Sequence, residues 1–372
     1  MHLIDDSQLN KSMHLKQNAE LQNGKYRIAR ALGQGGFGIT YLAENILLGN
    51  QVAIKEFFSK DYCGRNTTSH LTLGTESNRE TVAKLKDRFL KEARNIAKLD
   101  HPGIVRVFDV FEENDTAYYV MEYIHGENLN EIVKQNGPLP EDKAIKYVTE
   151  VGSSLEYIHS KNMTHFDVKP ANIIIRKKDD LPILIDFGLS KQYDSKGDAT
   201  STMMQAVSHG YSPIELYNAG AIQVFSPQTD VYSLGATLYY LVTGAVPPHA
   251  SVLIDKGIYL SNSFSKSLQC VIIQSMKISR ERRIKSISDF IKLLTNPESS
   301  IETQQIIHNP KISMEESSGY INYNSPDVED DDRTFYCRFL DRLCGDRQWA
   351  RDLVTTLILV GLVGGVFLLK FL

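Results

Sequence analysis

The sequence predicts an α+β protein with two lobes, followed by a polar linker and a single C-terminal transmembrane helix. Three observations lead to this prediction. Short strand-like runs dominate residues 25–124, and helical periodicity dominates residues 125–295. The third is an uncharged apolar run of 17 residues, LVTTLILVGLVGGVFLL, at positions 353–369. We therefore expect an antiparallel, β-rich N-terminal lobe, a helical C-terminal lobe and a membrane anchor.

The composition excludes several classes of protein. Hydrophobic residues make up 42% of the 372 residues and charged residues 23%, which excludes collagen-like, wholly disordered and multi-span membrane proteins. The net charge of −4 gives no basic field for nucleic acid. The N-terminus, MHLIDDSQLN, lacks the apolar core of a secretory signal. The four cysteines show no CxxC spacing, which favours free thiols in a reducing compartment over disulfides or zinc: Cys63, Cys270, Cys337 and Cys344.

In the first lobe the predicted elements follow one another closely. Residues 1–24 are polar and read as a loose arm, and residues 56–80 read as a long loop. A helix is expected over 81–99, because apolar residues recur at spacings of three and four. Alternating apolar runs predict the strands 25–32, 39–47, 51–58, 104–113 and 117–124.

The second lobe is expected to contain helices over 141–160, 229–243, 264–276 and 286–294. Ser286, with Asp289 three residues later, resembles a capping box. Beyond residue 295 the hydrophobic periodicity is lost, and residues 315–332 contain seven acids without a Lys or Arg. Residues 296–352 therefore read as an acidic, solvated linker with a juxtamembrane segment.

Two motifs in the first lobe point to a phosphate-binding site. Gly33-Gln34-Gly35-Gly36-Phe37-Gly38 lies between two predicted strands, which favours a glycine-rich flap over a dinucleotide-binding turn. Lys55 follows 17 residues after Gly38 on a strand, and its ammonium could neutralise nucleotide phosphates. The lysine needs an acid to orient it, and Glu92 on the predicted helix is the best candidate, with Glu80 as the competitor. The alternative is that Lys55 and Glu92 are unrelated surface charges.

Two further motifs carry a family resemblance. His165-Phe166-Asp167-Val168-Lys169-Pro170-Ala171-Asn172 precedes an apolar run, and Asp186-Phe187-Gly188 follows another. Together with the flap, Val52-Ala53-Ile54-Lys55 and the helix Glu, these stand in the order of the eukaryotic-type (Hanks-type) protein kinase family, which the chain resembles over residues 25–295. The loop THFDVKPANIII and the run GYSPIELY look most like bacterial Ser/Thr kinases. The resemblance implies lobes at 25–124 and 125–295, ahead of a linker at 296–352 and a span at 353–372.

The resemblance also implies a role for each matched residue. The flap residues Gly33 to Gly38 would cover the phosphates of ATP, and Lys55, held by Glu92, would orient them. Adenine would sit on Ala53 under Thr40, beside the hinge residues Met121, Glu122 and Ile124. Asp167 would act as the catalytic base and Lys169 would offset charge on the γ-phosphoryl group. Asn172 and Asp186 would hold Mg²⁺, or Mn²⁺. Ser208 would contact the loop that carries Asp167, and Asp230 would be a buried residue that opens the large central helix. Arg283 would pair with Glu215 of the A-P-E-like motif.

The chain departs from the family pattern at three positions. Thr40 replaces a Val, which leaves the adenine roof similar in shape, and Ile214 replaces the Pro of the A-P-E motif. Phe166 stands where many kinases have an Arg that pairs with a phosphate on the activation loop. Phe cannot make that pair, so we expect activity that does not depend on phosphorylation of the candidate loop sites Thr200, Ser201 and Thr202.

The terminal apolar run is expected to cross the membrane, because 17 to 25 apolar residues span a bilayer. A buried core helix or an amphipathic segment is the alternative, but the run has no polar face. Arg347, Trp349 and Arg351 precede it, which predicts a single-pass protein of the cell (inner) membrane with a cytoplasmic catalytic domain. Gly361 and Gly365 form a GxxxG motif through which two copies could pair.

Three functions fit these observations. The first is a Ser/Thr protein kinase that uses ATP and a divalent cation and acts on protein substrates. The second is a pseudokinase scaffold that binds nucleotide without chemistry, and the joint presence of Lys55, Asp167, Asn172 and Asp186 argues against it. The third is a small-molecule kinase on the same fold, which Glu215 together with Arg283 disfavours.

Overall fold

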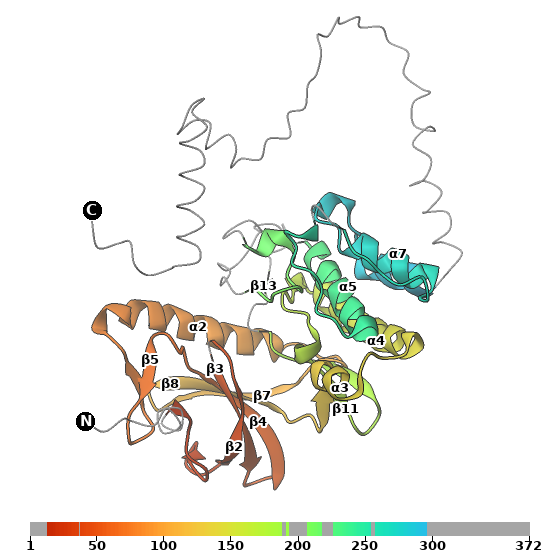
Figure 1. The fold of residues 1–372 in the computed structure, drawn as a ribbon. Coiled ribbons are helices and arrows are strands. Elements are labelled where there is room, and N and C mark those ends of the chain that lie inside the picture. Colours follow the sequence, from red (N-terminus) through yellow and green to blue (C-terminus); the bar gives the residue numbers. More distant parts are fainter. Residues whose placement is uncertain are drawn as a thin grey trace, which may run out of the picture. The chain divides into compact units, whose positions relative to one another are not determined.

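The computed structural model describes residues 13–36, 38–187, 191–192, 207–217, 226–253 and 257–295. Residues 1–308 form one compact unit and residues 309–372 a second, of which nothing is described. The first unit has two lobes, a sheet-rich one that contains α2 and a helical one that contains α4, α5 and α7 (Figure 1). The bilobal α+β prediction is therefore confirmed for this unit.

A six-stranded antiparallel sheet forms the N-terminal lobe, in the order β1-β2-β3-β4-β8-β7. Helix α2 lies along the sheet (Figure 1) and buries Phe89 and Ala93 against it. The elements of this lobe are β1 (Glu20–Leu21), β2 (Tyr26–Gln34), β3 (Gly38–Asn45), β4 (Asn50–Phe57), β5 (Cys63–Arg65), β6 (Leu71–Leu73), a 3₁₀ turn (Glu76–Asn78), α2 (Arg79–Ile96), β7 (Val107–Glu113) and β8 (Thr116–Glu122).

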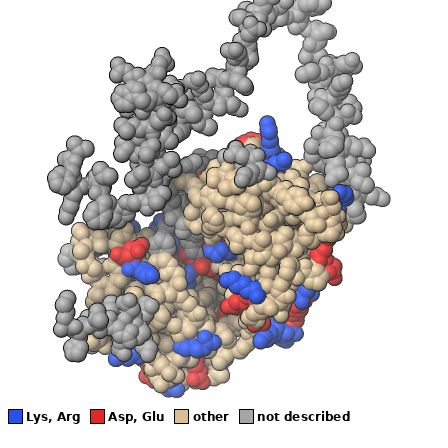
Figure 2. All heavy atoms as spheres, viewed as in Figure 1, with Lys and Arg blue, Asp and Glu red and all other residues tan. Residues whose placement is uncertain are grey.

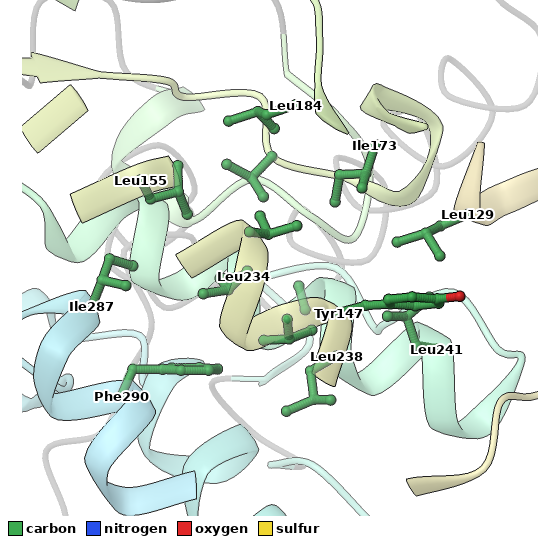
Figure 3. Packing of buried hydrophobic residues seen from close by; sticks show 14 of the residues in the cluster. Leu129, Tyr147, Leu155, Ile173, Leu184, Leu234, Leu238, Leu241, Ile287 and Phe290 are labelled. Atoms are coloured by element: carbon green, nitrogen blue, oxygen red, sulfur yellow. The ribbon is translucent and has the colours of Figure 1, made fainter. Parts of the chain in front are cut away.

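The C-terminal lobe packs its helices around one apolar core. This lobe also contains a three-stranded sheet of order β12-β11-β9. Side chains from α4, α5 and α8 pack in the core with Ile173 and Leu184 of that sheet (Figure 3). Its helices and strands are β9 (Gly126–Asn128), α3 (Leu129–Asn136), α4 (Glu141–Ser160), β10 (Met163–Thr164), β11 (Ile173–Arg176), β12 (Leu181–Leu184), β13 (Lys191–Gln192), α5 (Gln228–Thr243), α7 (Lys266–Ser275) and α8 (Ile287–Thr295). Single 3₁₀ turns cover Pro170–Asn172, Ile214–Tyr217 and Arg280–Arg282.

The predicted helices agree with the structure to within three residues at each end. Helix α4 matches its prediction at both ends. Its first turn carries Glu141 and Asp142, whose negative charges interact favourably with the positive end of the helix dipole. Helix α5 ends where Gly244 takes φ +71°, a conformation that glycine adopts without strain. The amide of Asp289 donates to Ser286 Oγ at 3.0 Å, so Ser286 caps α8 as expected.

Two sequence predictions are wrong, and one helix was missed. The loop expected over 56–80 contains the hairpin β5–β6, whose three-residue strands are too short to show a period. The arm is not loose over its described residues, because Leu15 and Leu21 are buried and β1 pairs with β2. Helix α3, which Asn128 caps together with Glu131, was not anticipated.

Candidate active site

Lys55 lies at the centre of a charged cluster that joins the two lobes. Its ammonium is 2.7 Å from Asp186 Oδ1 in the C-terminal lobe and 3.7 Å from Glu92 Oε1 on α2. Burial acts to lower the pKa of Lys55, but the Asp186 carboxylate, with contributions from Tyr119 and Glu92, outweighs it and raises that pKa well above its ordinary value. Lys55 therefore stays protonated, and its predicted ion pair with Glu92 is present.

Helix α2 brings Glu92 to the lysine because Phe89, one turn earlier, packs on Phe57 and Tyr119 of the sheet. The Tyr119 hydroxyl donates to Glu92 Oε1 at 3.3 Å. Burial raises the pKa of Glu92, although Lys55 partly offsets the effect. The competing candidate, Glu80, instead pairs with Lys84 on the exposed face of the same helix.

The glycine-rich flap is the turn between β2 and β3. Gly33 pairs with Thr40 across the two strands, and the amide of Gly35 donates to the carbonyl of Gly38 at 2.8 Å. A Cβ atom on Gly38 would come within 2.8 Å of the Glu56 carbonyl, so only glycine fits there. A Cβ on Gly33 or Gly36 would meet nothing within 4 Å among the described residues, which leaves open space beside the flap backbone. Phe37 lies outside the described residues.

Asp167 is the hub of the loop after β10. Its Oδ2 accepts hydrogen bonds from Lys169 Nζ at 2.8 Å and Asn172 Nδ2 at 2.9 Å. Its Oδ1 accepts one from the Ser208 hydroxyl at 2.6 Å, and Lys169 Nζ also lies 2.8 Å from that hydroxyl. The side chains of Lys169, Asn172 and Ser208 are thus gathered around the Asp167 carboxylate, and Ser208 contacts this loop as expected.

Asp230 at the start of α5 fixes the main chain of this loop. Its carboxylate accepts the backbone N–H groups of His165 at 2.9 Å and Phe166 at 2.8 Å, together with His159 Nε2 at 2.8 Å. Burial alone would raise the pKa of Asp230, but these donors lower it, so the carboxylate is charged. Phe166 itself is buried at φ +65°, a strained conformation for a residue with a side chain.

A buried ion pair ties the segment after the loop to the helical core. Arg283 Nη2 donates to Glu215 Oε2 at 2.8 Å, and Arg283 also donates to the carbonyls of Lys277 and Ile278. The Arg283 guanidinium lies 5.1 Å from the centre of the Tyr232 ring. The expected pairing of Glu215 with Arg283 is therefore present.

The hinge residues lie where β8 meets the segment that leads into β9. Met121 is the cross-strand partner of Ala53, so the two residues lie side by side on the neighbouring inner strands β8 and β4. Glu122 pairs with Val52 and lies 3.9 Å from Arg176 of the C-terminal lobe. Ile124 is buried in the core of that lobe. These placements put Ala53 and the hinge together, as an adenine site requires.

Asn172 and Asp186 fit a hard cation by their chemistry. The Asn172 amide nitrogen donates to the backbone carbonyl and the side chain of Asp167, so its oxygen is the atom left to bind another partner. The Asp186 carboxylate is 44% exposed, and its backbone takes φ +60°. Amide and carboxylate oxygens are the ligands that magnesium and manganese prefer. Among the described residues, no group of three His, Cys, Asp or Glu gathers as a metal site.

Comparison with known proteins shows to which family this chain belongs. A model of the protein kinase domain matches residues 26–310, about three quarters of the chain. The chain belongs to the protein kinase family. A solved structure entitled "PpkA-294 apo form" superimposes with a TM-score of 0.63 at 27% identity, and covers 76% of this chain and all of its own.

Bacterial relatives match the same region. Serine/threonine-protein kinase PrkC of Bacillus subtilis (strain 168) is 32% identical over 225 residues, 60% of this chain and 31% of its own length. Serine/threonine-protein kinase B of Synechocystis sp. (strain ATCC 27184 / PCC 6803 / Kazusa) is 30% identical over 292 residues, 74% of this chain and 47% of its own. The chain therefore spans less than half the length of these two relatives, and it is similar to bacterial Ser/Thr kinases over the domain alone.

Several residues of the kinase site escaped the sequence analysis. Tyr119 reads as an ordinary apolar strand position, and His159 as a polar residue at the end of a helix. Glu56 and Arg65, described below, read as exposed charges of a strand and a loop. The one sequence signal that could have revealed Glu56 is its charge within the largely apolar run VAIKEFF, since a charge in a buried strand requires a partner.

Some predictions lie outside the described residues. These are the candidate phosphorylation sites Thr200, Ser201 and Thr202, the acidic linker, and the apolar run with Gly361 and Gly365. In the part of the chain that is described, no helix combines the length and the apolar character needed to cross a bilayer.

Proposed function

We propose that this chain is a membrane-anchored serine/threonine protein kinase, which transfers the γ-phosphoryl group of ATP to Ser and Thr hydroxyls of proteins. One observation supports the chemistry, namely that two charged groups of the expected kind are present together. Lys55 forms an ion pair with Asp186 across the lobes. The Asp167 carboxylate is hydrogen-bonded to Lys169, Asn172 and Ser208. These groups supply the cation, the base and the cation ligands that phosphoryl transfer uses.

The nucleotide would lie between the flap and the hinge. The backbone amides of Gly33 to Gly38 would approach the phosphates, since open space adjoins Gly33 and Gly36. Lys55 would bind the α and β phosphates in place of its present bond to Asp186. Adenine would sit against Ala53 and Thr40 and hydrogen-bond the main chain of the hinge residues Met121, Glu122 and Ile124.

Asp167 would accept the proton of the acceptor hydroxyl and align its oxygen with the γ-phosphorus. Lys169 would stabilise the negative charge of the transferred group, and Ser208 would hold Asp167 in its orientation. Asn172 and Asp186 would hold Mg²⁺, with Mn²⁺ as the other suitable ion. When bound, such an ion neutralises phosphate charge.

The active conformation would not depend on a phosphate on the activation loop. Phe166 provides no guanidinium for such a phosphate, and Asp230 already holds the loop by its main chain. We therefore assign the kinase to the group that lacks the arginine before the catalytic aspartate.

The apolar run 353–369 would anchor the enzyme in the cell (inner) membrane, with residues 25–295 as the cytoplasmic catalytic domain and 296–352 as a tether. Gly361 and Gly365 would allow two anchors to pair. On the face of the compact unit drawn in Figure 2, basic and acidic side chains are interspersed, which suits a protein substrate better than nucleic acid.

A single assay tests the catalytic part of the proposal. The full chain is incubated in detergent with labelled ATP, magnesium and a generic protein acceptor, beside the variants Asp167→Asn and Asp179→Asn. Loss of a general base costs about 10²- to 10⁴-fold, so label should appear on Ser or Thr in the wild type and in Asp179→Asn but fall by that factor in Asp167→Asn. Asp179 is a matched control because it lies on an exposed turn, paired with Arg176.

Equal incorporation by the wild type and Asp167→Asn would instead favour the pseudokinase scaffold. Label on a small acceptor but not on protein would favour the small-molecule kinase. The anchor is tested separately by alkaline extraction of membranes: the full chain should remain in the pellet, and a chain without residues 353–372 should be released. Release of both would refute the anchor.

A further inference from the structure

The N-terminal sheet is covered on both faces. Side chains alternate along β4, so Lys55 and Phe57 point to the face that carries α2, and Glu56 points to the opposite face. That second face is covered by residues 13–19 and by residues 63–73, which include the hairpin β5–β6. We call these two segments the outer cover. Its apolar residues Leu15, Cys63 and Leu71 belong to the same buried cluster as the sheet.

A buried ion pair lies beneath the outer cover. Arg65 Nη2 is 2.6 Å from Glu56 Oε2, and the exposed fractions of the two side chains are only 2% and 0%. The hydroxyls of Tyr41 and Tyr118 each donate to Glu56 at 2.9 Å, one to each carboxylate oxygen. Removal of one partner from such a pair leaves a charge without water or counter-ion, so the Glu56 side chain is held firmly in place.

Arg65 also connects both parts of the outer cover. Its Nε donates to the Met13 carbonyl at 2.8 Å, and its Nη1 donates to the Ser69 carbonyl at 2.7 Å. The amide of Leu15 donates to the Tyr41 hydroxyl at 3.0 Å. One guanidinium thus joins the arm, the hairpin and strand β4, a task that suits its planar set of five donors.

The outer cover and the segment that leads into it also contact the glycine-rich flap. His14 Nε2 lies 3.1 Å from Gln34 Oε1, and the His14 ring packs edge-on against Tyr41. The amide of Lys60, which precedes the hairpin, donates to the carbonyl of Gly36 at 3.3 Å. The flap is therefore linked to the same structure that fixes Glu56.

We propose that Arg65 is a positioning residue for nucleotide binding: it holds Glu56, and through it the strand and flap that present Lys55 and the phosphate-binding amides. Glu56 and Lys55 are neighbours on one extended strand, so a side chain locked on one face fixes the direction of the other. Without Arg65, Glu56 would keep only its two tyrosine donors beneath a looser cover, and the arm and hairpin would lose their common donor. The inference rests on the nucleotide site proposed above.

The decisive variant is Arg65→Lys. Lysine keeps a positive charge beside Glu56 but has its donors on one atom, so it cannot reach Met13, Ser69 and Glu56 together. We expect the KM for ATP to rise about five-fold or more, the equivalent of one lost hydrogen bond in the bound state. The KM for the protein acceptor should stay within two-fold of the wild-type value, as an approximate bound.

A second measurement needs no nucleotide. Hydrogen exchange on the unliganded full chain should show faster exchange at the amides of Leu15 and Lys60 in Arg65→Lys, with no change in α4. The double variant Glu56→Gln/Arg65→Met removes the buried charge together with its partner and serves if Arg65→Lys does not fold. It should raise the KM for ATP in the same way.

Lys25→Met is the matched control, because Lys25 forms a 2.7 Å ion pair with Asp109 in the same lobe without touching the flap. It should bind ATP as the wild type does, which would show that the proposed nucleotide site is intact. An unchanged KM for ATP, together with unchanged exchange at the amides of Leu15 and Lys60, in both Arg65 variants would overturn the inference. Failure of the wild type to bind ATP would refute the nucleotide site itself.

Discussion

The backbone N–H of Phe166 donates a hydrogen bond to Oδ1 of Asp230 at 2.8 Å, across 64 residues of sequence. The residue before Asp167 is therefore held by its main chain, while its own side chain is buried and carries no charge. The main chain of the loop is thus attached to helix α5, and the only segment contact of its Asp167 side chain among the described residues that follow Phe187 is with the Ser208 hydroxyl. The first two predictions follow from that attachment.

Asp230→Asn should weaken both stability and catalysis. An amide accepts from one N–H group but directs its own N–H₂ at the other, so a buried donor loses its partner at a cost of about 1–3 kcal/mol. Urea unfolding should show that loss in the free energy of unfolding, and kcat should fall. The control Asp179→Asn removes a partly exposed ion pair and should change stability by no more than about 1 kcal/mol. Equal stabilities of the two variants would contradict the role of Asp230.

Simultaneous replacement of Thr200, Ser201 and Thr202 by Ala should leave most activity intact, because Phe166 cannot bind a loop phosphate. Ser208→Ala is the contrasting variant, since the Ser208 hydroxyl donates to Asp167 at 2.6 Å. It should lower kcat on the same acceptor. A total loss of activity in the triple variant, with its fold preserved by circular dichroism, would refute independence from loop phosphorylation.

Glu92→Gln and Glu80→Gln form a matched pair on one helix. Glu92 is buried 3.7 Å from Lys55, whereas Glu80 is an exposed partner of Lys84. We expect Glu92→Gln to lower kcat/KM for ATP about ten-fold, because the neutral amide no longer attracts the Lys55 ammonium and a loss of about 1.4 kcal/mol corresponds to that factor. Glu80→Gln should have no effect on that ratio. The measurement is steady-state kinetics with ATP varied, and similar values for both variants would rule out orientation of Lys55 by Glu92.

The unfolding free energy should fall as the pH is lowered below about 6.5, the ordinary pKa of histidine. Burial lowers the pKa of His165, so the folded protein keeps it neutral while the unfolded chain takes up a proton. Stability from this group is complete above pH 6.5 and declines toward the lowered folded pKa, by at most about 1.4 kcal/mol per pH unit.

The variant His165→Phe checks this pH dependence. Burial also lowers the pKa of His101, so the replacement should reduce the slope of stability against pH between 5 and 6.5 without abolishing it. Urea titrations at several pH values measure the slope. An unchanged slope would mean that the His165 ring becomes protonated in the folded state.

The sequence by itself determined the family and the inventory of the site. Lys55, Asp167, Lys169, Asn172 and Asp186 are recognisable because each stands in a motif of fixed local spacing, and those motifs survive without tertiary information. Helix α4 was predicted at both ends, because its apolar positions repeat over twenty residues. Periodicity over that length outweighs local ambiguity.

The tertiary structure decided several contacts that the sequence did not predict. Lys55 contacts Asp186, which lies 131 residues away in the sequence. Asp230 accepts hydrogen bonds from the amides of His165 and Phe166. Arg65 binds Glu56 from a hairpin that was predicted to be a loop. Short strands carry too few side chains to show a period, and a buried ion pair looks in the sequence like two surface charges. Motifs encode local geometry, whereas contacts across the sheet and between lobes depend on how distant segments pack.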